Sequence, residues 1–293
     1  MPDDARQTGT DQARLLQFAD IENPVALIGC DELAPVIRDL LRGWDIHDTL
    51  SSDAPQTDIV IRKTRKGYCR TSPWAAGDRV FRQPVDAVCD FLVDLTNAYL
   101  ADHPERLCLH TAAVQVDDGL VLLPGTYKAG KSTLSVHCAA AGFRLYSDDV
   151  LPVDGDARTA IAPGILPRLR LPLPDNSGKA FTDFVARHTG PKSDRYLYVD
   201  LAPDDFAPRG TRAPITAIVL LERIDEGQPE IAPISGSEAL KRAILQNFSR
   251  AQPAVQILDN LHAIVSGARC FELRYRTGEE AVDMIRLNVQ GGA

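Results

Sequence analysis

Short apolar runs and longer stretches with a helical repeat of apolar residues follow one another along this chain. Apolar runs bounded by turn-forming residues are typical of strands. They predict strands at residues 24–29, 58–61, 67–71, 107–114, 120–123, 143–146, 216–221 and 270–275. Apolar residues that recur every three to four positions are typical of helices that cover a core with one face. They predict helices at residues 33–41, 84–100, 132–141, 237–248, 255–265 and 279–287, and a frayed or helical lead-in at residues 1–20.

This mixture of elements predicts an α/β protein in two parts. The helix at residues 84–100 has one apolar face and is closed by Pro104. Directly after it the pattern changes to closely spaced strands, so we place the domain boundary there. Residues 1–104 then form a small α/β module of unknown role with a bridging helix, and residues 105–293 form the second domain.

Composition and charge exclude several classes of partner. The 293 residues include 32 Lys and Arg against 40 Asp and Glu, which gives a formal net charge of -8. Nucleic-acid-binding faces need clustered Lys and Arg, so we expect no nucleic acid partner. No apolar run approaches the roughly 20 residues that span a bilayer, and residues 1–17 lack the apolar core of a signal peptide. We therefore expect a cytoplasmic protein with no membrane partner.

One loop carries the clearest chemical motif. Between a predicted strand and a predicted helix, the sequence fits Gly-x-x-x-x-Gly-Lys-Ser/Thr, the phosphate-binding P-loop. The residues are Gly125, Thr126, Tyr127, Lys128, Ala129, Gly130, Lys131 and Ser132, followed by Thr133. The glycines let successive N–H groups point at a phosphate, and the helix adds the positive end of its dipole. In this motif Lys131 reaches the β- and γ-phosphates and the Ser132 hydroxyl binds Mg²⁺; the alternative is a plain strand-to-helix turn.

Three further side chains are expected near this loop. Asp148 and Asp149 follow the next predicted strand, and a carboxylate at a strand end is where P-loop proteins hold Mg²⁺. Neighbouring side chains of a strand point to opposite sides, so one carboxylate could hold metal while the other accepts a proton from a hydroxyl. A turn or a cap is the alternative for this pair. His110 lies in the predicted strand 107–114, where a lone histidine is usually a core residue.

His110, the loop at residues 125–133 and Ser147-Asp148-Asp149 together resemble the catalytic domain of HPr kinase/phosphorylase and its HPr-kinase-related relatives. The resemblance is specific over about residues 107–153 and diffuse from there to the C-terminus. It implies a P-loop kinase domain of the HPr kinase and phosphoenolpyruvate carboxykinase type, with a mixed, partly antiparallel sheet.

The resemblance also implies roles for individual residues. Lys131 and Ser132 would bind the phosphates and Mg²⁺, and Asp148 would be the metal partner. Asp149 would be the base that deprotonates an acceptor serine, with His110 supporting it. The order of the two aspartate roles is left open.

The sequence departs from this family after the aspartate pair. A glycine-rich signature with an Arg-Gly step is replaced by a Pro-rich stretch at residues 162–172. Arg168 and Arg170 in this stretch could clamp a triphosphate or a phosphorylated product, and solvated or structural arginines are the alternative. This departure leaves the acceptor and any reverse phosphorylase reaction open.

The expected function is that of an ATP- and Mg²⁺-dependent kinase that transfers the γ-phosphate to a hydroxyl, a serine of a protein or peptide. A phosphocarrier-like protein and a precursor peptide are both candidate acceptors. A nucleotide-binding regulatory or scaffold protein without phosphotransfer is one alternative, and a small-molecule kinase is another. Whether the chain forms a homo-oligomer is left open.

Overall fold

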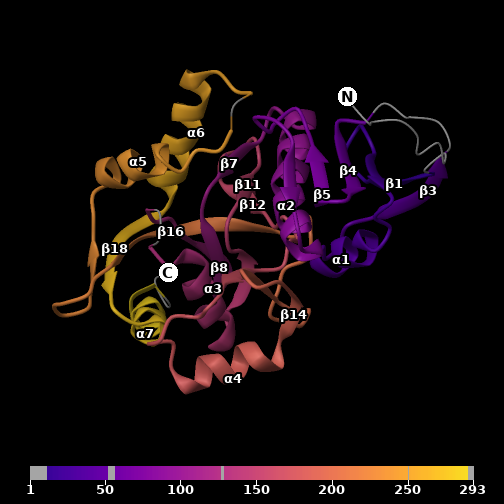
Figure 1. Cartoon of the computed structure of the whole chain (residues 1–293). Helices are drawn as coiled ribbons and strands as arrows, with labels where there is room; N and C mark the ends of the chain where they lie inside the picture. The colour runs from indigo at the N-terminus through magenta and orange to yellow at the C-terminus, as the bar shows by residue number, and fades with distance from the viewer. Residues whose placement is uncertain (1–11, 52–56, 127–128, 250, 290–293) are drawn as a thin grey trace. The chain divides into compact units, whose positions relative to one another are not determined.

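The computed structural model describes residues 12–51, 57–126, 129–249 and 251–289. It belongs to the mixed α/β class and divides into two compact units (Figure 1). Unit 1 comprises Met1–Arg38 and Asp45–Asp102, and unit 2 comprises Asp39–Trp44 and His103–Ala293. The segment Asp39–Trp44 thus belongs to unit 2, which the apolar periodicity does not predict. No helix within the described ranges is both long and apolar enough to cross a lipid bilayer.

A single mixed sheet forms the framework of unit 1. Its six described strands are ordered β3-β1-β2-β4-β5-β6. Their bounds are β1 Ala13–Phe18, β2 Val25–Ile28, β3 Ile46–Ser51, β4 Ile59–Thr64, β5 Gly67–Thr71 and β6 Arg79–Phe81. β2 and β4 are parallel, and the other neighbours are antiparallel. Helix α1 (Leu33–Leu40) begins in this unit, and α2 (Pro84–Asp102) packs on β5 and β6.

Strand β1 corrects the expectation of a frayed or helical lead-in at residues 1–20. Leu16 and Phe18 are fully buried, whereas Gln17 between them is only half-buried. This alternation is the pattern of a strand. Backbone pairing with β2 on one side and β3 on the other holds the segment extended, and the apolar content of a single short run does not reveal such pairing.

A buried ion cluster joins α2 to the sheet of unit 1. Arg70 on β5 contacts Asp90 at 2.5 Å and also pairs with Asp94, both on α2. The Arg70 side chain is only 3% exposed, so its charge depends on these carboxylates rather than on water. Burial raises the pKa of Asp94, and Arg70 opposes that shift.

A larger mixed sheet forms the centre of unit 2. Its nine described strands include the order β10-β8-β9-β16-β12-β11-β7, and β18 joins β17 to β16. Their bounds are β7 Leu107–Leu109, β8 Ala112–Val116, β9 Gly119–Leu123, β10 Arg144–Ser147, β11 Leu151–Val153, β12 Thr159–Ile161, β16 Arg212–Arg223, β17 Glu230–Pro233 and β18 Arg269–Tyr275. β16 is parallel to β9 and β18, whereas the other pairs are antiparallel. The predicted mixed, partly antiparallel sheet is confirmed.

Four helices described in unit 2 flank this sheet (Figure 1). They are α3 Lys131–Ala140, α5 Gly236–Ile244, α6 Ala254–Gly267 and α7 Gly278–Val289. α5 and α6 pack over the core cluster that includes Leu120 and Leu122 of β9. α3 packs against β8 and β10 and also against α7. The loop after β9 therefore leads directly into α3, which packs on the sheet.

Helix α5 differs from the predicted helix at both ends. It begins at Gly236 rather than at residue 237, and Ser235 caps it, with its Oγ accepting the N–H of Glu238. The helix ends at Ile244 instead of residue 248. The chain leaves the helix there because it pairs with β7 instead, and the N–H of Phe248 donates to the carbonyl of Cys108 at 2.8 Å.

A small antiparallel sheet begins within the Pro-rich stretch and was not predicted. Its order is β13-β15-β14, with bounds β13 Arg168–Arg170, β14 Thr189–Lys192 and β15 Tyr196–Val199. Helix α4 (Lys179–Arg187) lies between β13 and β14 in the chain. β13 is only three residues long and sits among prolines, so its pairing with β15 defines it rather than any local pattern.

Candidate functional site

The start of the loop after β9 is held against β16. The N–H of Leu221 donates to the carbonyl of Pro124 at 2.9 Å, and Gly125 continues the parallel pairing with Leu221. A side chain at Gly125 would place its Cβ 2.8 Å from the Cβ of Ala129. Glycine is therefore the residue that lets the loop close on itself here. Tyr127 and Lys128, two predicted contacts of the nucleotide, lie outside the described residues.

Gly130 ends the loop and begins α3. Its φ of 87° lies in the left-handed region, and it caps the helix without any side-chain hydrogen bond. The first N–H groups of a helix have no acceptor within the helix, so those at the start of α3 can point at an anion. An added Cβ would also meet the Tyr275 hydroxyl oxygen at 2.8 Å. The positive φ and the close approach of the Tyr275 hydroxyl both explain why a glycine occupies this position.

Tyr275, at the end of β18, holds the loop in place through a hydrogen bond. Its hydroxyl donates to the carbonyl of Ala129, and burial raises its pKa to about 12. The hydroxyl therefore keeps its proton and stays a donor at neutral pH. Sequence reasoning missed Tyr275 because its strand is predicted as core, and no motif links residue 275 to residue 129.

Lys131 lies over the loop that it follows. Its ammonium donates to the carbonyl of Gly125 at 3.0 Å. Burial lowers the pKa of this side chain, and the charges of Asp149 and Asp148 oppose the shift. The Lys131 ammonium thus contacts the start of the loop and is influenced by the charges of both carboxylates.

Asp148 is buried beside the start of α3. Its Oδ2 accepts the N–H of Arg168 at 3.0 Å, and its carboxylate lies beside the Ser132 side chain. Burial and then the charge of Asp149 raise the pKa of Asp148 to about 6, although the N–H of Arg168 and the nearby Ser132 hydroxyl oppose the shift. The two predicted metal ligands, Ser132 and Asp148, are therefore neighbours.

These two oxygen donors fit Mg²⁺. This ion keeps several waters and uses one or two carboxylates together with substrate phosphates, rather than a cage of protein ligands. One buried carboxylate beside one hydroxyl at the start of a helix is such a set. Among the described residues, no three or more His, Cys, Asp or Glu side chains gather as a self-sufficient metal cluster.

Asp149 points to a different partner. Its Oδ1 lies 2.8 Å from Nε2 of His110, and its Oδ2 lies 3.9 Å from Nη2 of Arg168. Burial alone would raise the pKa of Asp149, but the hydrogen bond from His110 and the charges of His110, Arg168 and Lys131 outweigh it and lower the pKa. Asp149 is thus ionised and oriented at neutral pH.

Strand register brings His110 to Asp149. β7 pairs with β11 so that Leu109 lies opposite Leu151, and the residue after β7 reaches the turn before β11. Ser147 holds that turn, because its Oγ donates to the carbonyl of Val150 at 2.6 Å and accepts the N–H of Asp149 at 3.2 Å.

The predicted continuous strand at residues 107–114 is wrong at His110. The chain breaks there into β7 and β8, which pair with different parts of the sheet, β11 for one and β9 and β10 for the other. The N–H of His110 donates to the carbonyl of Gln246 at 2.7 Å, and its side chain is 47% exposed. His110 is therefore a surface residue of the site and not a core histidine.

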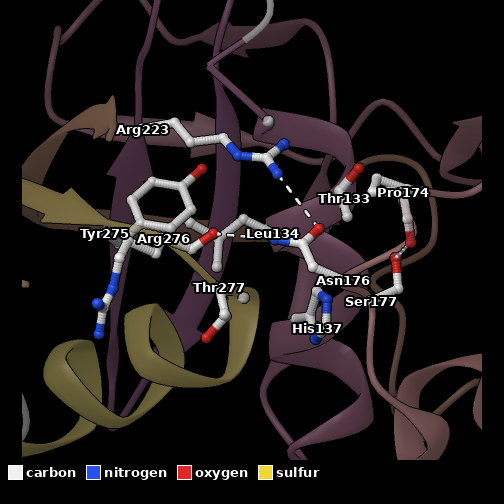
Figure 2. Close-up of a pocket in the computed structure, with 12 residues that line it drawn as sticks. Thr133, Leu134, His137, Pro174, Asn176, Ser177, Arg223, Tyr275, Arg276 and Thr277 are labelled. Carbon is white, nitrogen blue, oxygen red and sulfur yellow. Dashed lines mark hydrogen bonds between the residues drawn. The ribbon is translucent and has the colours of Figure 1, made fainter. Parts of the chain in front are cut away.

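The structure brings most of the sequence-derived candidates together around the loop. Lys131, Ser132, Asp148, Asp149 and His110 form one connected group, and Arg168 reaches both carboxylates through its backbone and its side chain. Arg170 lies two residues further along β13 and is exposed. Thr133, in the first turn of α3, lines a separate pocket (Figure 2).

Comparisons with known proteins add little to this geometry. No protein-family model matches the sequence, and no curated protein matches it. Among solved structures, the chain is similar to the HPr(Ser) kinase/phosphatase from Coxiella burnetii, with 15% sequence identity and a TM-score of 0.33. That similarity covers 63% of this chain and 99% of the other. At this TM-score the similarity carries no argument, so the function has to be inferred from the geometry of the site.

Proposed function

We propose that this protein is an ATP- and Mg²⁺-dependent kinase that transfers the γ-phosphate to a hydroxyl, a serine of a protein or peptide. One observation carries the proposal: Asp149 pairs with His110, while the adjacent Asp148 lies beside Ser132 of the loop. A protein that only binds a nucleotide needs the metal carboxylate but has no use for a second carboxylate oriented by a histidine.

Separate residues bind the phosphates and the Mg²⁺ ion in this proposal. The N–H groups at the start of α3 and the Lys131 ammonium bind the β- and γ-phosphates. Ser132 and Asp148 hold Mg²⁺, which when bound neutralises charge on the phosphate oxygens. The position of Asp148 beside Ser132 supports giving the metal role to Asp148 rather than to Asp149.

Asp149 receives the acceptor hydroxyl. Its lowered pKa keeps it ionised, and His110 fixes the carboxylate through Oδ1. A carboxylate of low pKa is a weak base, but phosphoryl transfer depends mainly on placing the hydroxyl in line with the γ-phosphate. Asp149 therefore acts chiefly by accepting a hydrogen bond from the acceptor and takes its proton as the new bond forms.

The open position of this pair favours a macromolecular acceptor. The side chains of His110 and Asp149 are 47% and 44% exposed, so a serine on a peptide chain can approach them from solvent. A metabolite kinase would be expected to enclose its acceptor more fully. A phosphocarrier-like protein and a precursor peptide both satisfy this requirement.

Transfer of radiolabelled γ-phosphate to a library of serine-containing peptides tests the proposal. Wild-type protein with ATP and Mg²⁺ should label a subset of the library, and Asp149→Asn should lower that rate by about 10²-fold or more. Asp259→Asn, which changes an exposed carboxylate on α6, is the matched control and should transfer normally. Unchanged transfer by Asp149→Asn would remove this residue from the mechanism. Tight binding of ATP without transfer to any acceptor would support a regulatory nucleotide-binding protein instead.

A further inference from the structure

The small sheet β13-β15-β14 places an arginine next to Asp149. Nη2 of Arg168, the first residue of β13, lies 3.9 Å from Oδ2 of Asp149. The guanidinium of Arg168 also lies over the ring of Tyr196 on β15, 4.8 Å from the ring centroid. Its backbone N–H donates to Asp148, which fixes the start of β13 beside the acidic pair. The small sheet therefore begins at the carboxylate to which we assign the acceptor hydroxyl.

A second arginine contacts the same tyrosine ring. The guanidinium of Arg195 lies 5.1 Å from the centroid of Tyr196, and its Nη2 lies 3.3 Å from the tyrosine hydroxyl oxygen. The face of an aromatic ring attracts cations, so one ring can hold two guanidinium groups near each other. The ring carries no net charge. The positive charges of Arg168 and Arg195 are therefore gathered at this ring without being neutralised by it.

Strand register adds a third arginine to this face. β13 pairs with β15 so that Arg170 lies directly opposite Tyr196. Directly opposed residues of an antiparallel pair share one face of the sheet, and Arg168, two positions earlier, shares it too. The side chain of Arg168 is 25% exposed, whereas Arg170 and Arg195 are exposed residues. These three residues, the arginine cluster, thus extend from Asp149 to solvent.

The charge of the small sheet is opposite to that of the whole chain. The chain carries a formal net charge of -8. Strand β13 and residues 189–199 contain four Lys or Arg, and Asp194 is their one acidic residue. A positive surface on a negative protein attracts anionic partners to that surface and disfavours cationic ones. The arginine cluster is therefore suited to an acidic partner.

The spacing along β13 relates this charge to the acceptor. Arg170 follows Arg168 by two residues, which span roughly 6–7 Å in a strand. An extended peptide has the same rise per residue. A peptide whose serine lies at Asp149 can therefore place the side chain about two or three residues away at the exposed end of the cluster. A guanidinium binds a carboxylate through two parallel N–H groups, which makes Asp or Glu the matching residue there.

We propose that the arginine cluster binds an acidic side chain of the acceptor, about two or three residues from the serine that receives the phosphate. The proposal rests on the proposed function, because it places that serine at Asp149. It narrows the acceptor to a serine in an acidic segment. It also assigns acceptor recognition to Arg195, a residue that no sequence motif marks.

Kinetics with matched peptides test this proposal. Each serine peptide carries Glu, Gln or Lys at one flanking position, on either side of the serine. In the wild-type protein, kcat/KM for the best Glu peptide should exceed that of its Gln counterpart by about tenfold, and the Lys peptide should be poorest. Higher salt should reduce this Glu-over-Gln ratio, because ions screen exposed charges.

Charge reversal identifies the residues that cause the preference. Arg170→Glu and Arg195→Glu should each lower the Glu-over-Gln ratio by about tenfold and leave KM for ATP within about twofold of wild type. Both arginines are exposed, so neither change should unfold the chain. Arg187→Glu is the matched control, since it reverses an exposed arginine of α4 that lines a cleft with residues of α3 and α7. The control should keep the wild-type ratio.

The outcomes separate this proposal from the kinase proposal. Equal kcat/KM for Glu and Gln peptides in the wild-type protein, or an unaltered ratio in both reversal variants, would overturn the acidic-acceptor assignment and leave the kinase proposal standing. A raised KM for ATP with an unaltered peptide ratio would also overturn it, and would assign the cluster to the triphosphate. Absence of transfer to every peptide would overturn both proposals.

Discussion

Nε2 of His110 lies 2.8 Å from Oδ1 of Asp149, although the two residues belong to different segments separated by the loop at residues 125–130 and α3. The break between β7 and β8 frees His110 from the core, and pairing of β7 with β11 carries it to the turn that holds Asp149. The pair has consequences for pH dependence that can be measured.

Replacement of His110 should shift the acid limb of the pH–rate profile. The hydrogen bond and charge of His110 help to lower the pKa of Asp149 against the effect of burial. In His110→Ala the pKa of Asp149 should therefore rise, and the fraction ionised at a given acidic pH should fall. The turnover number measured from about pH 5 to 8 should show an acid limb displaced to higher pH. The exposed His262 on α6 supplies the control His262→Ala, and an identical profile in both variants would contradict the pairing.

Loss of the Ser132 hydroxyl should weaken the response to Mg²⁺. Ser132→Ala removes one of the two oxygen donors assigned to the ion, while Asp148 and the phosphates remain. We expect the Mg²⁺ concentration for half-maximal transfer to rise by about tenfold or more. Ser237→Ala, at an exposed serine of α5, should leave it unchanged. If Ser132→Ala needs no more Mg²⁺ than wild type, the metal lies elsewhere.

An alanine at Gly130 should damage the loop more than the fold. The φ of 87° disfavours a side chain, and the new Cβ would meet the Tyr275 hydroxyl. A left-handed conformation costs an alanine roughly 1–2 kcal/mol, which chemical denaturation can measure. Calorimetry should show a much larger loss of tripolyphosphate affinity. Gly267→Ala changes a glycine with open space around it and should retain both properties. Normal phosphate binding by Gly130→Ala would argue against this role of the loop.

The Arg70→Met substitution should lower the free energy of unfolding mainly because it breaks the ion cluster of unit 1. Removal of the guanidinium leaves Asp94 buried and Asp90 nearly so, each without its main partner. Breaking such a buried pair costs about 3–5 kcal/mol of unfolding free energy. Arg79→Met removes the exposed partner of the same Asp90 and should cost no more than about 1 kcal/mol.

The pH dependence of the Arg70→Met variant provides a second check on this cluster. Burial already raises the pKa of Asp94, and loss of Arg70 should raise it further. A group whose pKa is higher in the folded state stabilises the fold as it becomes protonated, so the variant should recover stability relative to wild type as the pH falls. A deficit that stays constant with pH would show that lost packing, rather than uncompensated charge, causes the destabilisation.

Local sequence patterns anticipated the elements that carry long apolar runs or strong helical spacing. The loop at residues 125–133 combines special residues with fixed spacing, so its position between β9 and α3 needed no long-range information. The strand order needed such information, because β16 lies beside β9 only after a long intervening stretch has folded elsewhere. The short β13 and the early end of α5 are likewise defined by partners distant in the chain.

By itself the amino-acid sequence determined the position of the glycine-bounded loop between a strand and a helix, the adjacent carboxylates and the α/β class, because each depends on neighbouring residues and their spacing. Only the tertiary structure decided that His110 is exposed and paired with Asp149, and that Asp148 lies beside Ser132. It alone placed Tyr275 beside the loop, and Arg168 and Arg195 at the ring of Tyr196. These contacts form between segments brought together by strand pairing and burial, and the free energy of that pairing is not a property of any one segment.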